Sequence, residues 1–239
     1  MTSLDSQTLP RHLKRGALRG LYAITDERMG GGHVATAQAA LEGGARILQL
    51  RDKTTPPRQL LPIALQLRVL TRQFGALFII NDSLDLALAA RADGVHLGPE
   101  DWPVAVARGV LGPHFLIGAS CHDLAEARRA EIEGADYIGV GAIFATQTKL
   151  DAGDAIGLEA LREIARGTML PIAAIGGIEE SNIGDLPAAG AEMACVVSAI
   201  ARAGNPIAMS EAARCLHLVF QRASESQRQR RMERADEVE

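Results

Sequence analysis

Gln49, Arg51 and Lys53 alternate within the segment Gln49-Leu50-Arg51-Asp52-Lys53, which closes a short apolar run and precedes a pair of prolines. Alternate residues of a β-strand point to the same face, so these three side chains would lie side by side at a strand end. An amide beside two cations is suited to holding a polyanion. The alternative is a solvated strand end with ordinary surface charge, and the segment by itself does not exclude it.

Two acidic residues, Asp82 and Asp101, follow the next two apolar runs. If those runs are adjacent parallel strands, both carboxylates face one point above the sheet. Mg²⁺ in proteins is usually held by one or two carboxylates, with water and substrate phosphates completing its shell. Each aspartate could instead cap a helix, because Asp82 precedes Leu84 and Asp101 precedes Pro103. Together with the nearby cationic segment, the pair favours a metal-diphosphate site.

A second anion site is predicted from the run Ala174-Ile175-Gly176-Gly177 and from Val197-Ser198-Ala199-Ile200. Paired glycines allow a backbone to approach a ligand closely, and Ser198 adds a hydroxyl. Loops after the last two strands of a barrel often bind phosphate in this way. Two anion sites with Mg²⁺ beside one of them indicate a reaction that joins a diphosphate substrate to a monophosphate substrate.

The elements that must position these residues follow one repeated order. An apolar run of strand length is followed by a helical pattern and then by Gly or Pro. The predicted strands are 21–24, 47–51, 77–80, 95–97, 115–118, 137–140, 172–175 and 193–197, and the predicted helices are 34–41, 58–74, 84–90, 104–110, 124–133, 158–165, 183–189 and 206–220. About eight such units predict an α/β fold, a single (β/α)₈ TIM barrel. An open doubly wound sheet shares the alternation, but the length and regular spacing favour the barrel.

The ends of the chain lack this repeated order. Residues 1–19 mix polar and basic residues without periodicity and are predicted to be an irregular lead-in to a barrel over residues 20–220. Residues 221–239 carry Arg and Glu on most faces and are predicted to be a frayed or disordered tail. Arg-rich ends of this kind can also bind partner subunits, so a homo-oligomer is one possibility.

Composition narrows the class of partner. The 239 residues are 47% hydrophobic but only 3% aromatic, so Ala, Leu, Ile and Val must fill the core. A formal charge of -4 gives no basic footprint for nucleic acid, and no apolar run is long enough to span a membrane. Three dispersed cysteines and the absence of an apolar signal core fit the cytoplasm. The expected partners are small phosphorylated molecules.

In its ordered motifs the chain resembles the thiamine-phosphate synthase family, from about Gly20 to Phe220. The motifs that carry the resemblance are Leu21-Tyr22-Ala23-Ile24-Thr25-Asp26, Gln49-Leu50-Arg51-Asp52-Lys53, Ile80-Asn81-Asp82, Asp93-Gly94-Val95-His96-Leu97-Gly98-Pro99-Glu100-Asp101, Gly118-Ala119-Ser120-Cys121-His122, Thr146-Gln147-Thr148-Lys149, Ala174-Ile175-Gly176-Gly177 and Val197-Ser198-Ala199-Ile200. The family joins a hydroxymethylpyrimidine diphosphate to a hydroxyethylthiazole phosphate, releasing diphosphate.

The resemblance implies a role for each matching residue. It assigns the pyrimidine diphosphate to Gln49, Arg51, Lys53 and Asn81, Mg²⁺ to Asp82 and Asp101, and the thiazole phosphate to Thr146, Thr148, Gly177, Val197 and Ser198. It also implies that Ser120 and Lys149 reach the diphosphate or the reacting centre, so that they would act with Arg51 in catalysis.

Two alternatives remain open at the level of sequence. A thiazole tautomerase of the same fold would bind the thiazole phosphate alone and would use His122 as its acid-base residue. The metal and diphosphate residues argue against it, since a tautomerase needs neither. A protein that senses thiamine phosphates without turning them over is the other alternative. One departure from the family pattern is Ser83, where many members carry a further acid.

Overall fold

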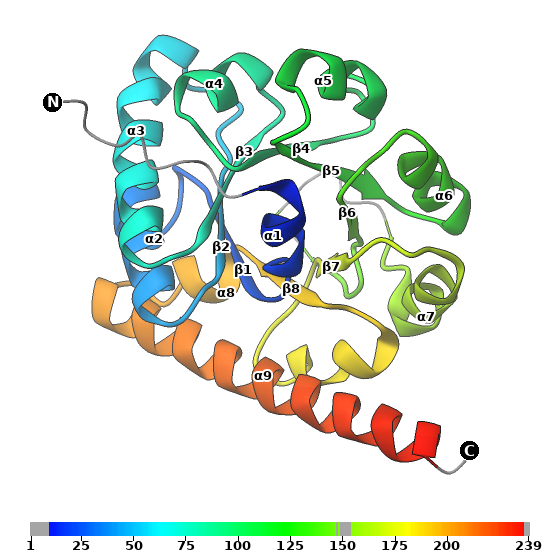
Figure 1. The fold of residues 1–239 in the computed structure, drawn as a ribbon. Coiled ribbons are helices and arrows are strands. Elements are labelled where there is room, and N and C mark those ends of the chain that lie inside the picture. Colours follow the sequence, from blue (N-terminus) through cyan, green and yellow to red (C-terminus); the bar gives the residue numbers. More distant parts are fainter. Residues whose placement is uncertain (1–9, 147, 149–153, 237–239) are drawn as a thin grey trace, which may run out of the picture.

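Eight parallel strands close into a barrel in the computed structural model, which describes residues 10–146, 148 and 154–236 (Figure 1). Each strand pairs with its neighbours in the chain, and β8 pairs with β1 to close the ring. The strands are β1 Gly20–Thr25, β2 Ile47–Leu50, β3 Leu77–Asn81, β4 Gly94–Leu97, β5 Leu116–Cys121, β6 Tyr137–Val140, β7 Ile172–Ile175 and β8 Met193–Val196. The predicted (β/α)₈ barrel is therefore confirmed.

The helices form an outer ring around these strands (Figure 1). They are α2 His33–Glu42, α3 Pro57–Gln73, α4 Leu84–Ala89, α5 Val104–Leu111, α6 Leu124–Ile132, α7 Gly157–Gly167, α8 Ser198–Ala201 and α9 Pro206–Asp236, and a further helix, α1 Arg11–Gly16, precedes β1. Between β7 and β8 the predicted short helix is instead two 3₁₀ turns, η1 Ile183–Asp185 and η2 Pro187–Ala189.

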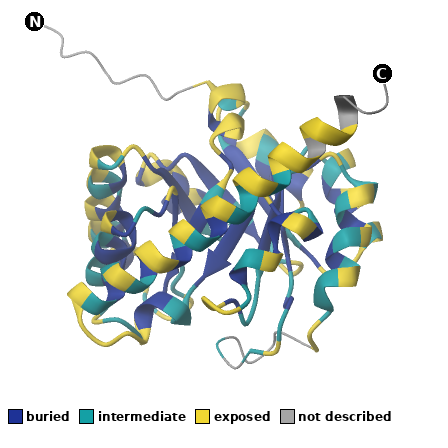
Figure 2. Cartoon of the chain, turned by 90° about the horizontal axis from the view of Figure 1, so that it is seen from below, coloured by how far each residue is buried: buried dark blue, intermediate teal, exposed yellow. Residues whose placement is uncertain are grey.

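The core has two layers, because alternate residues of each strand face opposite sides. Leu21, Ala23 and Leu50 belong to the larger layer between the strands and the helices. Tyr22 and Ile24 belong to the smaller layer inside the barrel. Figure 2 shows the strands buried at the centre, with helices around them that expose only their outer faces. The polar side chains of the site must therefore come from inward positions and from the loops that follow the strands.

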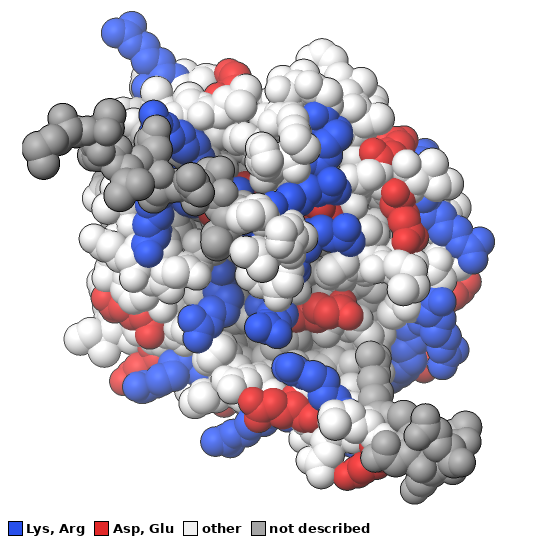
Figure 3. All heavy atoms as spheres, viewed as in Figure 1, with Lys and Arg blue, Asp and Glu red and all other residues white. Residues whose placement is uncertain are grey.

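Helix α1 corrects the expectation of an irregular lead-in for residues 11–16, because it closes the amino end of the barrel; residues 1–9 lie outside the described residues. Lys14 is almost fully buried, and its Nζ lies 3.3 Å from Asp93 Oδ1. Arg11 Nε donates to Asp136 Oδ1 at 2.6 Å. Asp93 and Asp136 directly precede β4 and β6, so the helix is fixed by long-range ion pairs that its own sequence does not show. Figure 3 views this face and shows Lys and Arg side chains gathered around its centre.

The tail also differs from the prediction, since α9 continues as one helix through Asp236. Its first half packs on the barrel through Met209, Ala213, Leu216 and Phe220, which are buried at helical spacing. Beyond Phe220 the side chains are polar on most faces, but Gln, Arg, Glu and Ala are good helix formers and extend a helix already anchored by packing. Among the described residues, no helix is both long and apolar enough to cross a membrane.

Candidate active site

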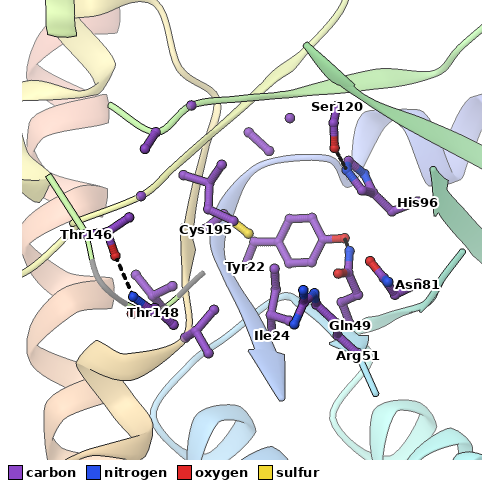
Figure 4. Close-up of a pocket in the computed structure, with 18 of the residues that line it drawn as sticks. Tyr22, Ile24, Gln49, Arg51, Asn81, His96, Ser120, Thr146, Thr148 and Cys195 are labelled. Carbon is purple, nitrogen blue, oxygen red and sulfur yellow. Dashed lines mark hydrogen bonds between the residues drawn. The ribbon is translucent and has the colours of Figure 1, made fainter. Parts of the chain in front are cut away.

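One pocket opens at the carboxyl ends of the strands, opposite α1 (Figure 4). In a barrel of this kind the catalytic residues come from this end. The predicted site residues that line it are Gln49, Arg51, Lys53, Asn81, Asp82, Ser120, Thr146, Thr148, Gly177, Val197 and Ser198. Asp101 lies behind Asp82 rather than in the lining. Lys149 is outside the described residues. The structure thus gathers side chains from distant parts of the chain around one cavity.

Side chains at the end of β2 and in the loop after it point alternately toward the pocket and away from it. Gln49 points into the barrel, where its Nε2 donates to the Tyr22 hydroxyl at 2.7 Å. Leu50 is buried in the outer core layer. Asp52 turns away from the pocket and accepts hydrogen bonds from the backbone N–H groups of Thr54 and Thr55 at 2.8 and 2.9 Å. Leu50 and Asp52 are both absent from the lining of the pocket, as expected for residues that alternate with Gln49, Arg51 and Lys53.

Asp52 is held firmly in this turn. Its second oxygen lies 3.2 Å from Nε2 of His33, at the start of α2. Burial alone would raise the pKa of Asp52, but the hydrogen bonds from Thr55, Thr54 and His33 together hold it well below its usual value. The ionised carboxylate therefore fixes the loop from which Arg51 and Lys53 extend.

The two predicted metal ligands come together at one side of the pocket. Burial and the neighbouring Asp101 carboxyl raise the pKa of Asp82 to about 6, against which the nearby Lys53 acts only in part. Lys53 Nζ lies 3.4 Å from Asp82 Oδ2. Asp101 Oδ2 also accepts the Gly98 N–H at 2.7 Å. The two carboxyl groups are hard oxygen donors, and Lys53 offsets their negative charge only in part. Such a pair is suited to binding a divalent cation.

Neither aspartate caps a helix, which removes the simpler explanation for their positions. The cap of α4 is Ser83, whose Oγ accepts the Leu86 N–H at 3.3 Å. The residue before α5 is Pro103. Asp82 itself has a φ of 64°, a conformation that is costly for a residue other than glycine. Ser83 thus does the capping, so that the strained Asp82 carboxylate can face the pocket.

The opposite side of the pocket offers small residues and hydroxyls. Thr148 Oγ1 donates to Ser198 Oγ at 3.0 Å, which joins the β6 loop to the start of α8. Gly177 has a φ of 62°, and a Cβ there would lie 2.5 Å from the Ala145 carbonyl oxygen. Only glycine therefore fits where the loops after β6 and β7 cross. Exposed backbone and hydroxyl groups at this place are suited to a phosphate.

Sequence reasoning missed three residues at the pocket: Tyr22 and His96, which line it, and Tyr137, which contacts both of them. Tyr22 and Tyr137 are fully buried in the inner core layer, where their hydroxyls lie 3.0 Å apart. His96 lies between Tyr137 and Ser120, as described below. The available signal was a polar residue inside an apolar run, as in Val95-His96-Leu97. In a barrel strand, such a residue either faces the interior or disrupts the outer core.

His122, the acid-base residue of the alternative tautomerase reading, lines the pocket but is bound elsewhere. Its Nδ1 lies 3.1 Å from Glu126 Oε2, and the same carboxylate accepts its backbone N–H at 2.7 Å. The side chain is 47% exposed. This arrangement is that of a residue at a helix start held by its i+4 neighbour.

Comparison with known proteins decides the family. The family model described as thiamine monophosphate synthase matches residues 21–200. The chain belongs to the thiamine monophosphate synthase family. A Methanoculleus marisnigri protein named thiamine-phosphate synthase is 50% identical over 196 residues, covering 81% of this chain and 93% of the relative. A relative of the same name from Moorella thermoacetica is 48% identical over 205 residues, covering 85% and 96%.

A solved structure gives the same result. The thiamine phosphate pyrophosphorylase from Pyrococcus furiosus superposes with a TM-score of 0.80 at 41% identity, covering 88% of this chain and 98% of that one. As a member of the thiamine monophosphate synthase family, the chain is an enzyme of thiamine biosynthesis, a transferase with thiamine-phosphate synthase activity. The parts of the reaction played by individual residues are a separate matter.

Proposed function

We propose that the enzyme joins 4-amino-2-methyl-5-hydroxymethylpyrimidine diphosphate to hydroxyethylthiazole phosphate, giving thiamine phosphate and diphosphate. The observation that carries the proposal is the polarity of the pocket. One side has Arg51 and Lys53 beside the carboxylates of Asp82 and Asp101, and the other has the Gly177 loop and hydroxyls. Such a pocket suits a metal-bound diphosphate at one side and a monophosphate at the other.

Mg²⁺ is the proposed cofactor, held by Asp82 and Asp101. The donor set fits it, because both ligands are hard oxygens and the pKa of Asp82 is raised by burial and by the neighbouring Asp101 carboxyl, whose like charge a divalent cation would offset. When bound, Mg²⁺ supplies positive charge against the departing diphosphate. The chain's own residues supply the remainder.

Arg51 and Lys53 approach the diphosphate from the fixed loop after β2. The bond between the pyrimidine methylene carbon and its oxygen breaks, and the electron pair leaves with the diphosphate. Charge on that leaving group is stabilised by these cations and by the Ser120 hydroxyl. Asn81 and Gln49 hold the pyrimidine, and Lys149 is proposed to reach the reacting centre.

The thiazole nitrogen then attacks the resonance-stabilised methylene cation with its lone pair. Since that nitrogen carries no proton to lose, no strong general base is needed. The thiazole phosphate is proposed to bind at Gly177, Val197 and Ser198 with Thr146 and Thr148, which places the nitrogen over the carbon. Positioning of this kind supplies much of the rate.

Asp82→Ala tests the metal end of the pocket, with Asp85→Ala as the matched control in the first turn of α4. Coupling should fall by about 10²- to 10³-fold in Asp82→Ala, the typical effect of losing one group that stabilises developing negative charge, and should stay near normal in Asp85→Ala. Full activity of a folded Asp82→Ala enzyme would exclude the proposed metal site.

The same assay separates the alternative functions. A tautomerase would retain its activity in Asp82→Ala, and a sensor would bind both phosphates in calorimetry without releasing diphosphate. We also propose a cytoplasmic location, which is supported by three cysteines that are all free thiols.

A further inference from the structure

A chain of hydrogen bonds runs beneath the pocket from Gln49 to Ser120. Gln49 Nε2 donates to the Tyr22 hydroxyl at 2.7 Å, and the Tyr22 and Tyr137 hydroxyls lie 3.0 Å apart. Tyr137 Oη lies 3.1 Å from His96 Nδ1, and His96 Nε2 lies 3.1 Å from Ser120 Oγ. Figure 4 shows the two ends of this chain, with Gln49 pointing toward Tyr22 and His96 pointing toward Ser120.

Two glycines on neighbouring strands leave room for the rings of this hydrogen-bond chain. Gly118 on β5 faces the Tyr137 ring so closely that any Cβ there would overlap the phenol. Gly139 on β6 faces His96, and a Cβ there would lie 2.9 Å from Cε1 of the imidazole. The His96 and Tyr137 ring centroids are 5.5 Å apart. The rings are therefore held in place by packing as well as by hydrogen bonds.

The direction of the chain follows from the number of protons available. Burial raises the pKa of both Tyr22 and Tyr137, so each phenol keeps its single proton near neutral pH. The amide nitrogen of Gln49 can only donate. Tyr22 accepts that bond and gives its proton to Tyr137, which in turn gives its proton to Nδ1 of His96.

This direction also sets the last link. An imidazole whose Nδ1 accepts a hydrogen bond carries its ring proton on Nε2, which then donates to Ser120 Oγ. A hydroxyl that accepts this bond keeps its own proton for another acceptor. Ser120 lines the pocket, so that acceptor is a bound ligand.

We propose that His96 is a positioning residue, fixed in its Nε2–H tautomer by the buried tyrosines, which turns the Ser120 proton toward the departing diphosphate oxygen. The inference rests on the proposed function, because it assigns Ser120 to the leaving group. A hydroxyl aimed in advance at the place where negative charge develops needs no reorganisation during bond breaking. His96 also lines the pocket, but the role proposed for it is exerted through Ser120 Oγ.

The tautomer can be measured without any turnover. In full-length enzyme labelled with ¹⁵N-histidine and free of substrate, the ¹⁵N shifts distinguish a protonated ring nitrogen from a bare one, and the signals that disappear in His96→Gln belong to His96. The expected spectrum has a protonated Nε2 and a bare Nδ1. A proton on Nδ1 would mean that the chain runs in the opposite direction, and the proposal would be overturned.

Kinetics test the link to Ser120. The amide nitrogen of Gln takes the place of Nε2 of histidine and that of Asn takes the place of Nδ1, so only His96→Gln preserves a donor to Ser120. We expect kcat to fall about tenfold in His96→Asn, the effect of one lost hydrogen bond, and less than about threefold in His96→Gln, with both KM values unchanged.

The Ser120→Ala background separates positioning from a structural role. There the Gln and Asn variants at position 96 should have kcat values within about twofold of each other, because the hydroxyl that they orient is absent. If the ratio of kcat between the Gln and Asn variants at position 96 is the same with Ser120 present and in the Ser120→Ala background, the proposal would be overturned. If the Asn variant does not fold, Tyr137→Phe removes the donor to Nδ1 and should mix the two tautomers in the ¹⁵N spectrum. Absence of all coupling by the normal enzyme would refute the proposed function while leaving the spectrum to decide the tautomer.

Discussion

Replacing Asp82 with Asn should make the metal-free protein more stable while abolishing its activity. Asp82 is held in a left-handed conformation, its side chain is 26% exposed, and the Asp101 carboxyl lies beside it. Holding an ionised carboxylate there costs free energy. Asn keeps the shape and the tolerance for positive φ but carries no charge.

The size of the effect follows from the pKa. The pKa of Asp82 is raised from its usual 3.8 to about 6, and each pH unit corresponds to about 1.4 kcal/mol, so ionised Asp82 destabilises the folded state by up to about 3 kcal/mol. Because the folded pKa is the higher one, the stabilising contribution is complete below pH 3.8. It is lost progressively as the pH rises to about 6 and stays lost above that.

Urea unfolding in a metal chelator tests this reasoning at pH 4 and at pH 8. The two proteins should have similar free energies of unfolding at pH 4, and Asp82→Asn should be more stable by about 1–3 kcal/mol at pH 8. Asp85→Asn is the control, and its effect on the free energy of unfolding at pH 8 should have the opposite sign. The reason is that a hydrogen bond from Ser83 lowers the pKa of Asp85. A loss of stability in Asp82→Asn at pH 8 would refute the account of the carboxylate pair.

Three further predictions concern other parts of the molecule. Lys14→Met should lower the free energy of unfolding in urea by about 2 kcal/mol with kcat unchanged, since the buried Asp93, at the end far from the site, loses one ion-pair partner and keeps Arg68; unchanged stability would contradict the role given to α1. Gly177→Ala, compared with Gly109→Ala in open space, should raise KM for the thiazole phosphate at least about tenfold, because the strain of a positive φ costs on the order of 1–3 kcal/mol; an equal KM in both variants would contradict it. Ellman's reagent at pH 8 should titrate only exposed Cys215 in the native protein, because burial raises the pKa of Cys121 to about 12 and that of Cys195 as well; rapid reaction of three thiols would show that the site is open.

The barrel could be predicted because each strand and helix carries its own local pattern. Apolar runs of about three to five residues, punctuated by Gly and Pro, mark the strands, and the carboxyl ends of parallel strands must meet at one end of a barrel. For the same reason Gln49, Asp82 and Ser198 could be assigned to one pocket although they are far apart in sequence. The alternation from Gln49 to Lys53 further predicted which side chains line the pocket.

The predictions that were wrong or missing concern features that depend on long-range contacts, which no local sequence pattern indicates. Helix α1 has no apolar periodicity, and it is held by Asp93 and Asp136, which lie far from it in the sequence, Asp136 being 125 residues from Arg11. Strands buried on both faces are largely apolar, so apart from the polar His96 nothing local showed which residues point inward, and no local pattern showed that Tyr22 and His96 join into one chain. The extension of α9 has the composition of a solvated tail and is helical because it continues a packed helix.

The most direct test of the proposed chemistry is the coupling reaction itself, followed by the release of diphosphate and the formation of thiamine phosphate. Purified enzyme with both phosphorylated substrates and Mg²⁺ should form the two products in equal amounts, and a chelator or the omission of either substrate should stop both. Well-folded enzyme that releases no diphosphate under these conditions, or that releases it equally well in the chelator, would contradict the Mg²⁺-assisted transfer proposed for this pocket.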